Sequence, residues 1–229
     1  MATDAPIRTS MVPPPMTTSA QILTLTQWFS PSYPIGAFAY SHGLETAIQG
    51  GVVTSASTLK DWLKDVLEHG SGRTDCILLR AAYASEPDAL ANVDAVAQAF
   101  SASSERLHET RLMGDAFGKT TVAIWGGDAP PLTGPVAVGA AAQREGIPVD
   151  LTAAMYLQAF ASNLVSAAVR LVPLGQTEGQ TVLAELTPLC EAVADGCNGA
   201  TLDDLHSTAF LSDIAAMKHE TLQPRIFRT

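Results

Sequence analysis

The sequence predicts an all-α protein, a single globular bundle of roughly eight to ten helices with a flexible N-terminal arm and a flexible C-terminal tail. Apolar residues recur at spacings of three and four along most of the chain, which is the period of a helix with one buried face. No alternating strand pattern persists, and the chain has no internal repeat. Its 229 residues are 47% hydrophobic, which is enough to bury a sizeable core.

The first predicted helix, Gln21–Phe29, has its apolar residues on one stripe and is stopped by Pro31. A turn follows, and a second helix runs from about Tyr40 to Gln49, where two glycines close it. Ser57 is positioned to cap the next helix, which glycines interrupt near residue 70. Further helices are expected to open at Asp75, to span residues 87–100 and to span residues 104–125.

The second half of the chain begins with a loop at residues 126–131, which are rich in glycine and proline. Helices are expected at residues 137–144, 151–171 and 177–194, with one or two short helices between Leu202 and Pro224. The stretch Leu151–Val169 carries no formal charge. Its polar residues and many alanines favour a buried core helix over a membrane span.

No low-complexity linker divides the chain, so we expect one helical domain at residues 19–216. Residues 1–18 precede it as a disordered arm, because they contain the run Pro13–Pro15 and lack the apolar core of a secretory signal. Residues 217–229 follow it as a tail that we expect to bind a partner.

The charge balance of the chain is acidic, with 13 Lys and Arg against 23 Asp and Glu and a net charge of −10. Such a chain repels phosphate backbones and anionic membrane surfaces, so neither nucleic acid nor a membrane is expected as a partner. The three cysteines, Cys76, Cys190 and Cys197, form no Cys-x-x-Cys pair. An odd, low count predicts reduced thiols in a cytoplasmic protein.

No catalytic constellation appears in the sequence. It contains no His-Glu-x-x-His, no phosphate-binding Gly-x-x-x-x-Gly-Lys loop and no Gly-x-Ser-x-Gly elbow. We therefore expect no enzyme, no cofactor and no metal site within one copy of the chain. The five histidines are not paired at metal-ligand spacing, although a single histidine becomes two ligands across a dimer axis.

Three segments carry more unusual residues than a packed helix needs. The first is Pro34–Glu45, where glycines, aromatic residues and polar residues open a helix. It is compatible with a tight turn against another helix, or with a contact surface on which Phe38 and Tyr40 are candidate hot spots.

The second segment is the polar stripe Asn163, Ser166 and Arg170, which recurs at three and four on an otherwise apolar helix. A buried polar stripe needs partners, and these could lie in the core, in a second subunit or along a water-filled passage. The third segment is the tail, in which Ile226 and Phe227 stand between two arginines. The tail could dock on its own domain or become ordered on a partner.

Together these segments resemble the motifs of the UreF family of urease accessory proteins. The resemblance covers about residues 20–229. It rests on Pro34-x-Gly-Ala-Phe-x-Tyr-Ser-x-Gly-Leu-Glu45, on Asn163 followed by Arg170-Leu-x-Pro-Leu-Gly-Gln-x-x-Gly-Gln180, and on His219-Glu-Thr221 with Arg225-x-Phe227. The tail departs from the family at Pro224, Ile226 and Thr229, and the first 18 residues have no counterpart.

The resemblance implies an all-helical, commonly dimeric chaperone without enzymatic activity. Such a protein binds the accessory protein UreD (also called UreH) and recruits the GTPase UreG to apo-urease, so that nickel is inserted. Family membership also implies roles for individual residues. Those that would present the GTPase surface are Tyr40, Ser41, Gly43, Leu44, Glu45 and Arg225. Those of the tail that would become ordered on UreD or UreH are His219, Glu220, Thr221 and Phe227.

The family has been likened to GTPase-activating proteins, and Arg225 and Arg73 are the candidates for an arginine finger. The stripe of Asn163, Ser166 and Arg170 would line a dimer contact or a passage, although Arg170 opposes an open path for cations. The alternative function is a metallochaperone that binds nickel directly across a dimer. An all-α enzyme with a cryptic site is a further rival.

Overall fold

The structure, a computed structural model, describes residues 17–229. This part of the chain forms ten α-helices and three short 3-10 helices, and it contains no strand, as the sequence predicts. Almost all of the arm predicted at residues 1–18 lies outside the described residues.

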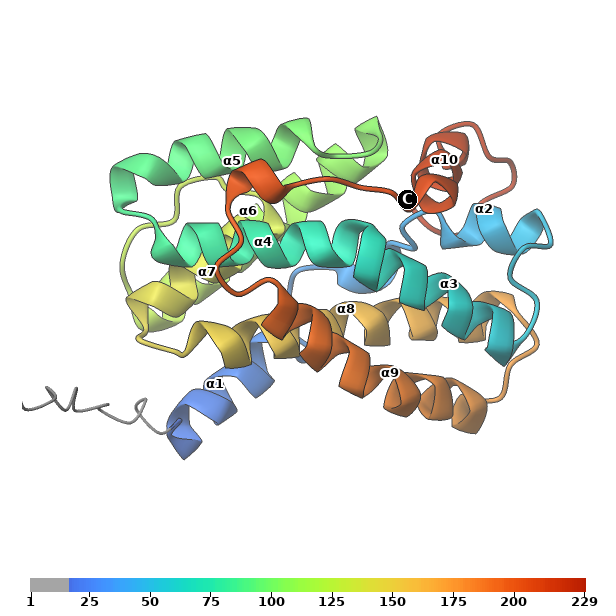
Figure 1. Ribbon diagram of the computed structural model, residues 1–229, viewed down its shortest axis with the longest axis horizontal. Helices are drawn as coiled ribbons and strands as arrows, with labels where there is room; N and C mark the ends of the chain where they lie inside the picture. The colour runs from blue at the N-terminus through green and yellow to red at the C-terminus, as the bar shows by residue number, and fades with distance from the viewer. Residues whose placement is uncertain (1–16) are drawn as a thin grey trace, which may run out of the picture.

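The helices bury their apolar stripes against one another around a central pair, α4 and α8 (Figure 1). The first half of the chain contributes α1 (Ser19–Trp28), α2 (Leu44–Gln49), α3 (Ala56–His69), α4 (Ser71–Ala84) and α5 (Leu90–Ala99). The second half contributes α6 (Ser104–Trp125), α7 (Gly134–Arg144), α8 (Val149–Leu171), α9 (Gln176–Gly196) and α10 (Phe210–His219). The short helices are η1 (Ala37–Ala39), η2 (Pro87–Ala89) and η3 (Leu202–Asp204).

The prediction for α2 is wrong at its start. The sequence predicts a helix from about Tyr40, but the helix begins at Leu44 because His42 and Gly43 both have positive φ angles, of 55° and 77°. Gly43 is required there, since a Cβ atom on it would lie 2.5 Å from the backbone nitrogen of Ala216 in α10. Residues 36–43 therefore form a turn, with the backbone of α10 packed directly against it.

Two predicted helix starts are also displaced by a few residues. Ser55, and not Ser57, caps α3, and it does so in a reciprocal pair of bonds with Thr58. The fourth helix begins at Ser71, before the predicted Asp75, because Gly70 alone makes the break. Ser103 caps α6 by accepting a hydrogen bond from the backbone nitrogen of Arg106.

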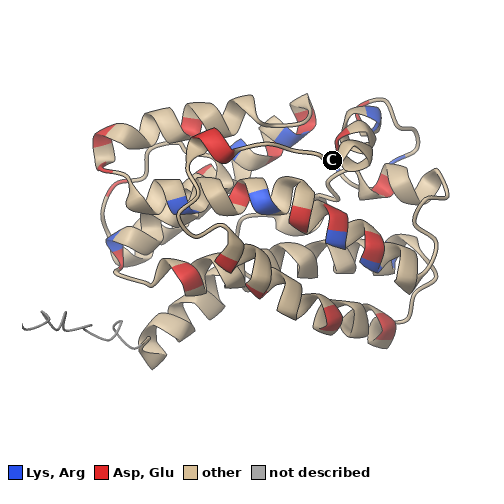
Figure 2. Cartoon of the chain, in the orientation of Figure 1, with Lys and Arg blue, Asp and Glu red and all other residues tan. Residues whose placement is uncertain are grey.

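The charged side chains are dispersed over the helices. In the view of Figure 2, Lys and Arg are scattered singly among the more numerous acidic residues. Among residues 17–229, no helix is both long enough and apolar enough to cross a membrane.

Candidate functional site

The three unusual segments of the sequence meet at one end of the molecule. The turn at residues 36–43, the C-terminal half of α8 and the tail at residues 220–229 are far apart in sequence. Hydrogen bonds link the turn to both α8 and the tail, and a cation–π contact links α8 to the tail. Figure 1 shows the C-terminus lying beside α2 and α10. We call this junction the tail seat.

Glu45 is the centre of the tail seat. Its side chain is fully buried, and its Oε1 and Oε2 atoms accept hydrogen bonds from the backbone nitrogens of Ile226 and Phe227, at 2.8 and 2.9 Å. The ring of His219 contributes Nε2, which lies 3.2 Å from Oε2 of the same carboxylate. A buried carboxylate needs such donors, and here three of them come from the tail and the last residue of α10.

A second carboxylate, Glu105 on α6, holds the other side of the tail. The Nδ1 atom of His219 lies 2.7 Å from Glu105 Oε2, and Arg225 donates a hydrogen bond to Glu105 Oε1. Both ring nitrogens of the buried histidine are thus occupied by carboxylates. Glu220 accepts hydrogen bonds from the backbone and hydroxyl of Ser104, at 2.8 and 2.7 Å, and these bonds lower the pKa of Glu220.

The end of the tail is bound to the turn itself. The backbone nitrogen and the hydroxyl of Ser41 both donate to the carbonyl of Thr229, and the backbone nitrogen of Arg228 donates to the carbonyl of Ala39 at 2.8 Å. The Thr229 hydroxyl donates to Glu109 at 2.7 Å. The tail therefore continues the main-chain hydrogen bonding of the turn, and it is ordered on its own domain.

Tyr40 lies beneath the end of the tail and is only 5% exposed. Burial and the charge of Glu109 raise the pKa of its phenol, against a hydrogen bond with Arg228 that lowers it. Of the residues that the resemblance assigns to the GTPase surface, Tyr40, Ser41, Gly43, Leu44 and Glu45 are buried, whereas Arg225 is exposed.

Two side chains of the polar stripe on α8 donate hydrogen bonds to the turn. Asn163 donates from Nδ2 to the carbonyl of Tyr40 at 3.3 Å, and Arg170 donates to the carbonyl of Phe38 at 3.0 Å. The guanidinium of Arg170 also lies 4.5 Å from the ring centroid of Phe227, which is a cation–π contact. Ser166 contributes its carbonyl, which accepts from Arg170 Nε at 3.2 Å. Two of the three stripe side chains thus find partners in this chain itself, but the stripe is not buried in the core as expected, because Ser166 and Arg170 are exposed and Asn163 is half-buried.

A buried charge cluster lies directly behind the tail seat. Arg106 and His42 both pair with Glu109, at 2.5 and 2.7 Å. Burial would raise the pKa of Glu109, but the charges of Arg106 and His42 outweigh it and hold that pKa at about 2. Burial and the charge of Arg106 lower the pKa of His42, against the pull of Glu109.

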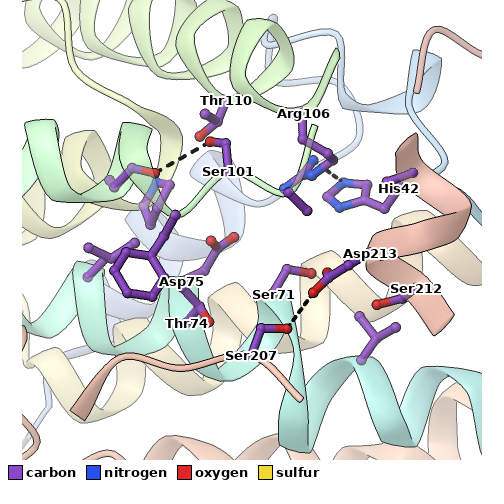
Figure 3. A pocket seen from close by; sticks show the side chains of 17 residues that line it. His42, Ser71, Thr74, Asp75, Ser101, Arg106, Thr110, Ser207, Ser212 and Asp213 are labelled. Carbon is purple, nitrogen blue, oxygen red and sulfur yellow. Dashed lines mark hydrogen bonds between the residues drawn. The ribbon is translucent and has the colours of Figure 1, made fainter. Parts of the chain in front are cut away.

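The charge cluster borders a cavity of about 90 Å³ between α4, α6 and α10, which polar and apolar side chains line together (Figure 3). Asp75 lines the cavity from α4 and accepts a hydrogen bond from the hydroxyl of Tyr156 at 2.8 Å. Burial raises the pKa of Asp75 to about 6, although Arg106 and the Tyr156 bond oppose the rise. The cavity is thus connected to the tail through Arg106, Glu109 and Thr229.

Sequence reasoning missed Asp75, Arg106 and Glu109 as members of the site. The available signal was the spacing of Glu105, Arg106 and Glu109, which places one arginine among carboxylates within a single turn of α6. Arg73, a candidate for an arginine finger, is not part of the tail seat. Its guanidinium donates to the carbonyl of Asp204 at 2.9 Å, whereas Arg225 binds Glu105.

The solvent side of this region exposes several apolar residues beside its arginines. Phe38 on the turn is 66% exposed and Ile226 in the tail is 73% exposed, while Phe227 between them and the core is buried. The outer face of α10 presents four more exposed apolar residues, Phe210, Leu211, Ile214 and Met217. Exposed apolar residues gathered in this way mark interaction sites on soluble proteins.

The UreF family model matches residues 53–187 of the chain. The urease accessory protein UreF of Ruegeria pomeroyi is 56% identical over 213 residues, which cover 93% of this chain and 98% of that protein. The chain belongs to the UreF family. Similar figures hold for the urease accessory protein UreF of Roseobacter denitrificans, with 55% identity over 93% of this chain and 96% of that protein. The relative from Rhodopseudomonas palustris is 42% identical over 98% of each chain.

The family model ends before the tail and begins after the turn, whereas the relatives cover nearly the whole chain. Of the residues that hold the tail, those on α6 and α8 lie inside the matched region of this UreF-family protein, whereas the turn and Glu45 lie outside it. In the described residues, no group of three or more His, Cys, Asp and Glu side chains is arranged to hold a metal ion.

Proposed function

We propose that this protein is a urease accessory chaperone that acts without catalysing a reaction itself. Together with UreD (UreH) it recruits the GTPase UreG to apo-urease, so that nickel is inserted and the metal centre matures. The observation that carries the proposal is the tail seat, where three motifs from distant parts of the chain form one interlocked unit with an apolar outer side. A catalytic site is not needed to explain any of these residues.

The geometry supports a division of labour among the motif residues. Ser41, Glu45 and His219 are buried and bound to one another or to the tail, so we assign them to positioning. Phe38 and Ile226 are exposed on the outer side, so we assign them to contact with the GTPase. Aromatic and arginine side chains are enriched at protein interfaces relative to the rest of the surface.

Arg225 is assigned to the same GTPase surface. Its side chain is held by Glu105 and by the carbonyl of His219, at 3.5 Å for the latter. An arginine finger must extend freely into the partner's active site, so the paired state of Arg225 favours an orienting role during regulation of GTP hydrolysis.

The outer face of α10 is assigned to UreD or UreH. Its exposed apolar residues follow one helix face, and α10 leads directly into the seated tail. A partner bound to α10 would therefore hold the tail in place and complete the neighbouring GTPase surface, which gives an ordered assembly. A homodimer in the cytoplasm is part of the proposal on the strength of the family resemblance alone.

The proposal is tested by capturing UreD and UreG with the tagged full-length chain and measuring urease activity after nickel is added. We expect Phe38→Ala and Ile226→Ala to keep UreD and to lower UreG capture and urease activation at least about tenfold. Ile214→Asp, on the outer face of α10, is expected to lower capture of both partners.

Phe100→Ala is the matched control, because Phe100 is a 43% exposed phenylalanine directly after α5 and belongs to neither the turn, the tail nor α10. It is expected to behave as wild type. The proposal is wrong if wild type captures neither partner, or if Phe38→Ala and Ile226→Ala retain UreG as well as the control does.

A further inference from the structure

The side chain of His219, the last residue of α10, lies between two carboxylates of the tail seat. Its Nδ1 atom is 2.7 Å from Oε2 of Glu105 on α6, and its Nε2 atom is 3.2 Å from Oε2 of Glu45 on α2. The side chains of His219 and Glu45 are 0% and 1% exposed, and that of Glu105 is 17% exposed. Water therefore reaches the Glu105 side of the ring more easily than the Glu45 side.

This arrangement determines how many protons the ring carries. A neutral imidazole has one N–H donor, and its other nitrogen is an acceptor with a lone pair. A carboxylate oxygen is also an acceptor, so a neutral His219 would turn a lone pair toward Glu45 or Glu105 at hydrogen-bond distance. Only the imidazolium form donates from both nitrogens, and the structure places an acceptor at each of them.

The remaining donors around the two carboxylates favour the charged form of each. Glu45 also accepts hydrogen bonds from two backbone nitrogens of the tail, and Glu105 accepts one from the guanidinium of Arg225. With a protonated His219, two negative groups meet two positive groups. A neutral His219 would leave an excess negative charge in a largely buried cluster, which costs free energy.

The neighbouring charged groups of residues 17–229 are bound to other residues or exposed to solvent, so they do not replace the two carboxylates at the ring. Asp213 and Glu220 accept hydrogen bonds from serine hydroxyls. Arg106 and His42 both pair with Glu109 behind the tail seat. The exposed groups on α6, α10 and the tail are His108, Arg111, Lys218 and Arg228.

We infer that His219 is a proton-dependent switch for the tail, which stays in its seat only while both ring nitrogens carry a proton. The inference rests on contacts within this chain, and it goes beyond the partners proposed above because it concerns a ligand, the proton, that the chain binds alone. It would make the surface formed by the seated tail depend on pH.

The unequal burial of the two carboxylates indicates which proton is lost and how the tail is released. Nδ1 gives up its proton to water, because only the Glu105 side of the ring is partly exposed. Glu105 then faces a lone pair and turns toward solvent together with Arg225, which it binds. The tail thereby loses its attachment to α6, while Nε2 keeps its proton toward the buried Glu45.

The direction of the pH dependence follows from the proton count. Once the tail and Glu105 have moved away, His219 is left as an ordinary histidine, which loses its second proton above about pH 6.5. The seated state therefore holds one more proton than the released state at neutral pH. Seating should weaken as the pH rises above about 7, by up to about tenfold for each pH unit.

The test is amide hydrogen exchange of the full-length protein at a series of pH values between about 6 and 9. The protection factors of Ile226 and Phe227, taken against a free peptide of residues 217–229 at the same pH, measure the seating equilibrium. We expect both to fall above about pH 7, with a slope that approaches tenfold per pH unit. The amide of Leu79 in the buried core is the internal reference, and its protection should not follow that of the tail.

His219→Gln removes the titrating group and leaves amide donors on one nitrogen only, so it cannot donate to both carboxylates. Protection of Ile226 and Phe227 should be low in this variant and should no longer change with pH as in wild type. His108→Gln is the matched control, because it removes an exposed histidine of α6, and it should keep the wild-type slope.

A second measurement on the wild-type protein needs no variant to fold. The ¹⁵N spectrum of the histidine rings at about pH 7.5 should show both nitrogens of His219 protonated, whereas the exposed His108 and His206 should be neutral. The inference is overturned if His219 has an unprotonated ring nitrogen at that pH while the tail is protected. It is equally overturned if the protection of Ile226 and Phe227 does not fall with rising pH in wild type.

Discussion

Two regions of the molecule join distant parts of the chain by opposite means. One is the contact between helices α4 and α7, and the other is the tail seat. At the first contact, Gly139 of α7 lies so close to α4 that an added Cβ atom would be 2.2 Å from the carbonyl oxygen of Leu79. The tail seat instead surrounds a fully buried carboxylate, Glu45, with backbone donors of the tail and the imidazole of His219 at the end of α10. The first contact depends on missing side-chain volume, and the second depends on matched polar groups.

This difference indicates which part of the molecule can detach locally while the rest stays folded. Backbone packing between two helices contributes to the common core, so it is lost only when the domain unfolds. The tail is held by few side chains and buries only Phe227 and Thr229 among its last five residues. It can therefore leave the seat while the bundle stays folded, which suits a segment that completes a partner surface.

The largest expected effect is at the helix contact. Gly139→Val should lower the free energy of unfolding by at least about 4 kcal/mol, because backbone of α4 fills the space that the new side chain needs. Urea denaturation followed by circular dichroism measures the loss. The matched control is Gly196→Val, where nothing lies within 4 Å of the added Cβ and the change should stay below about 1 kcal/mol. Equal losses in the two variants would contradict the packing argument.

The next effect is at the centre of the tail seat. Glu45→Ala leaves two backbone N–H groups and one side of His219 without an acceptor, so it should cost about 3 kcal/mol and release the tail. Limited trypsin digestion should then cut after Arg225 in a domain that is otherwise intact. Glu185→Ala, which removes an exposed ion pair with Lys60, should change neither stability nor cleavage by a measurable amount. A folded Glu45→Ala variant with a resistant tail would refute the role of Glu45.

The charged groups behind the tail seat make the stability of the folded chain depend on pH. The pKa of Asp75 is raised to about 6 in the folded chain, above its ordinary value of 3.8. Its contribution to stability is therefore present below about pH 4 and is lost as the pH rises to about 6. Asp75→Asn avoids that loss, so relative to wild type it should gain about 2–3 kcal/mol between pH 4 and pH 7.

Glu109 changes the stability of the chain with pH in the opposite direction to Asp75, and Glu109→Gln tests this. The folded pKa of Glu109 is held at about 2, below its ordinary value of 4.5, so its contribution is present above about pH 4.5 and is lost toward pH 2. The variant should be less stable than wild type at neutral pH, and the gap should close on acidification. Chemical denaturation at a series of pH values measures both trends. Parallel pH profiles for Asp75→Asn and Glu109→Gln would show that the cluster does not work as described.

The helices were predictable because their cause is local. Apolar spacing predicts α6, and the charge-free stretch predicts α8, since both follow from neighbouring residues. The start of α2 was not predictable, because it depends on the backbone of α10 lying against Gly43. The tail seat was predictable only as three unusual segments. Their union depends on buried carboxylates whose donors lie more than a hundred residues away along the chain, and periodicity carries no information about such pairs.

The central claim is that the tail lies in its seat in the isolated chain. Amide hydrogen exchange of the wild-type protein, read by mass spectrometry, tests it directly through the backbone N–H groups of Ile226, Phe227 and Arg228. Each donates to Glu45 or to the turn, so all three should exchange much more slowly than an unstructured peptide of the same sequence. Exchange at the rate of the free peptide would contradict the account, because the seat would then be empty until a partner filled it.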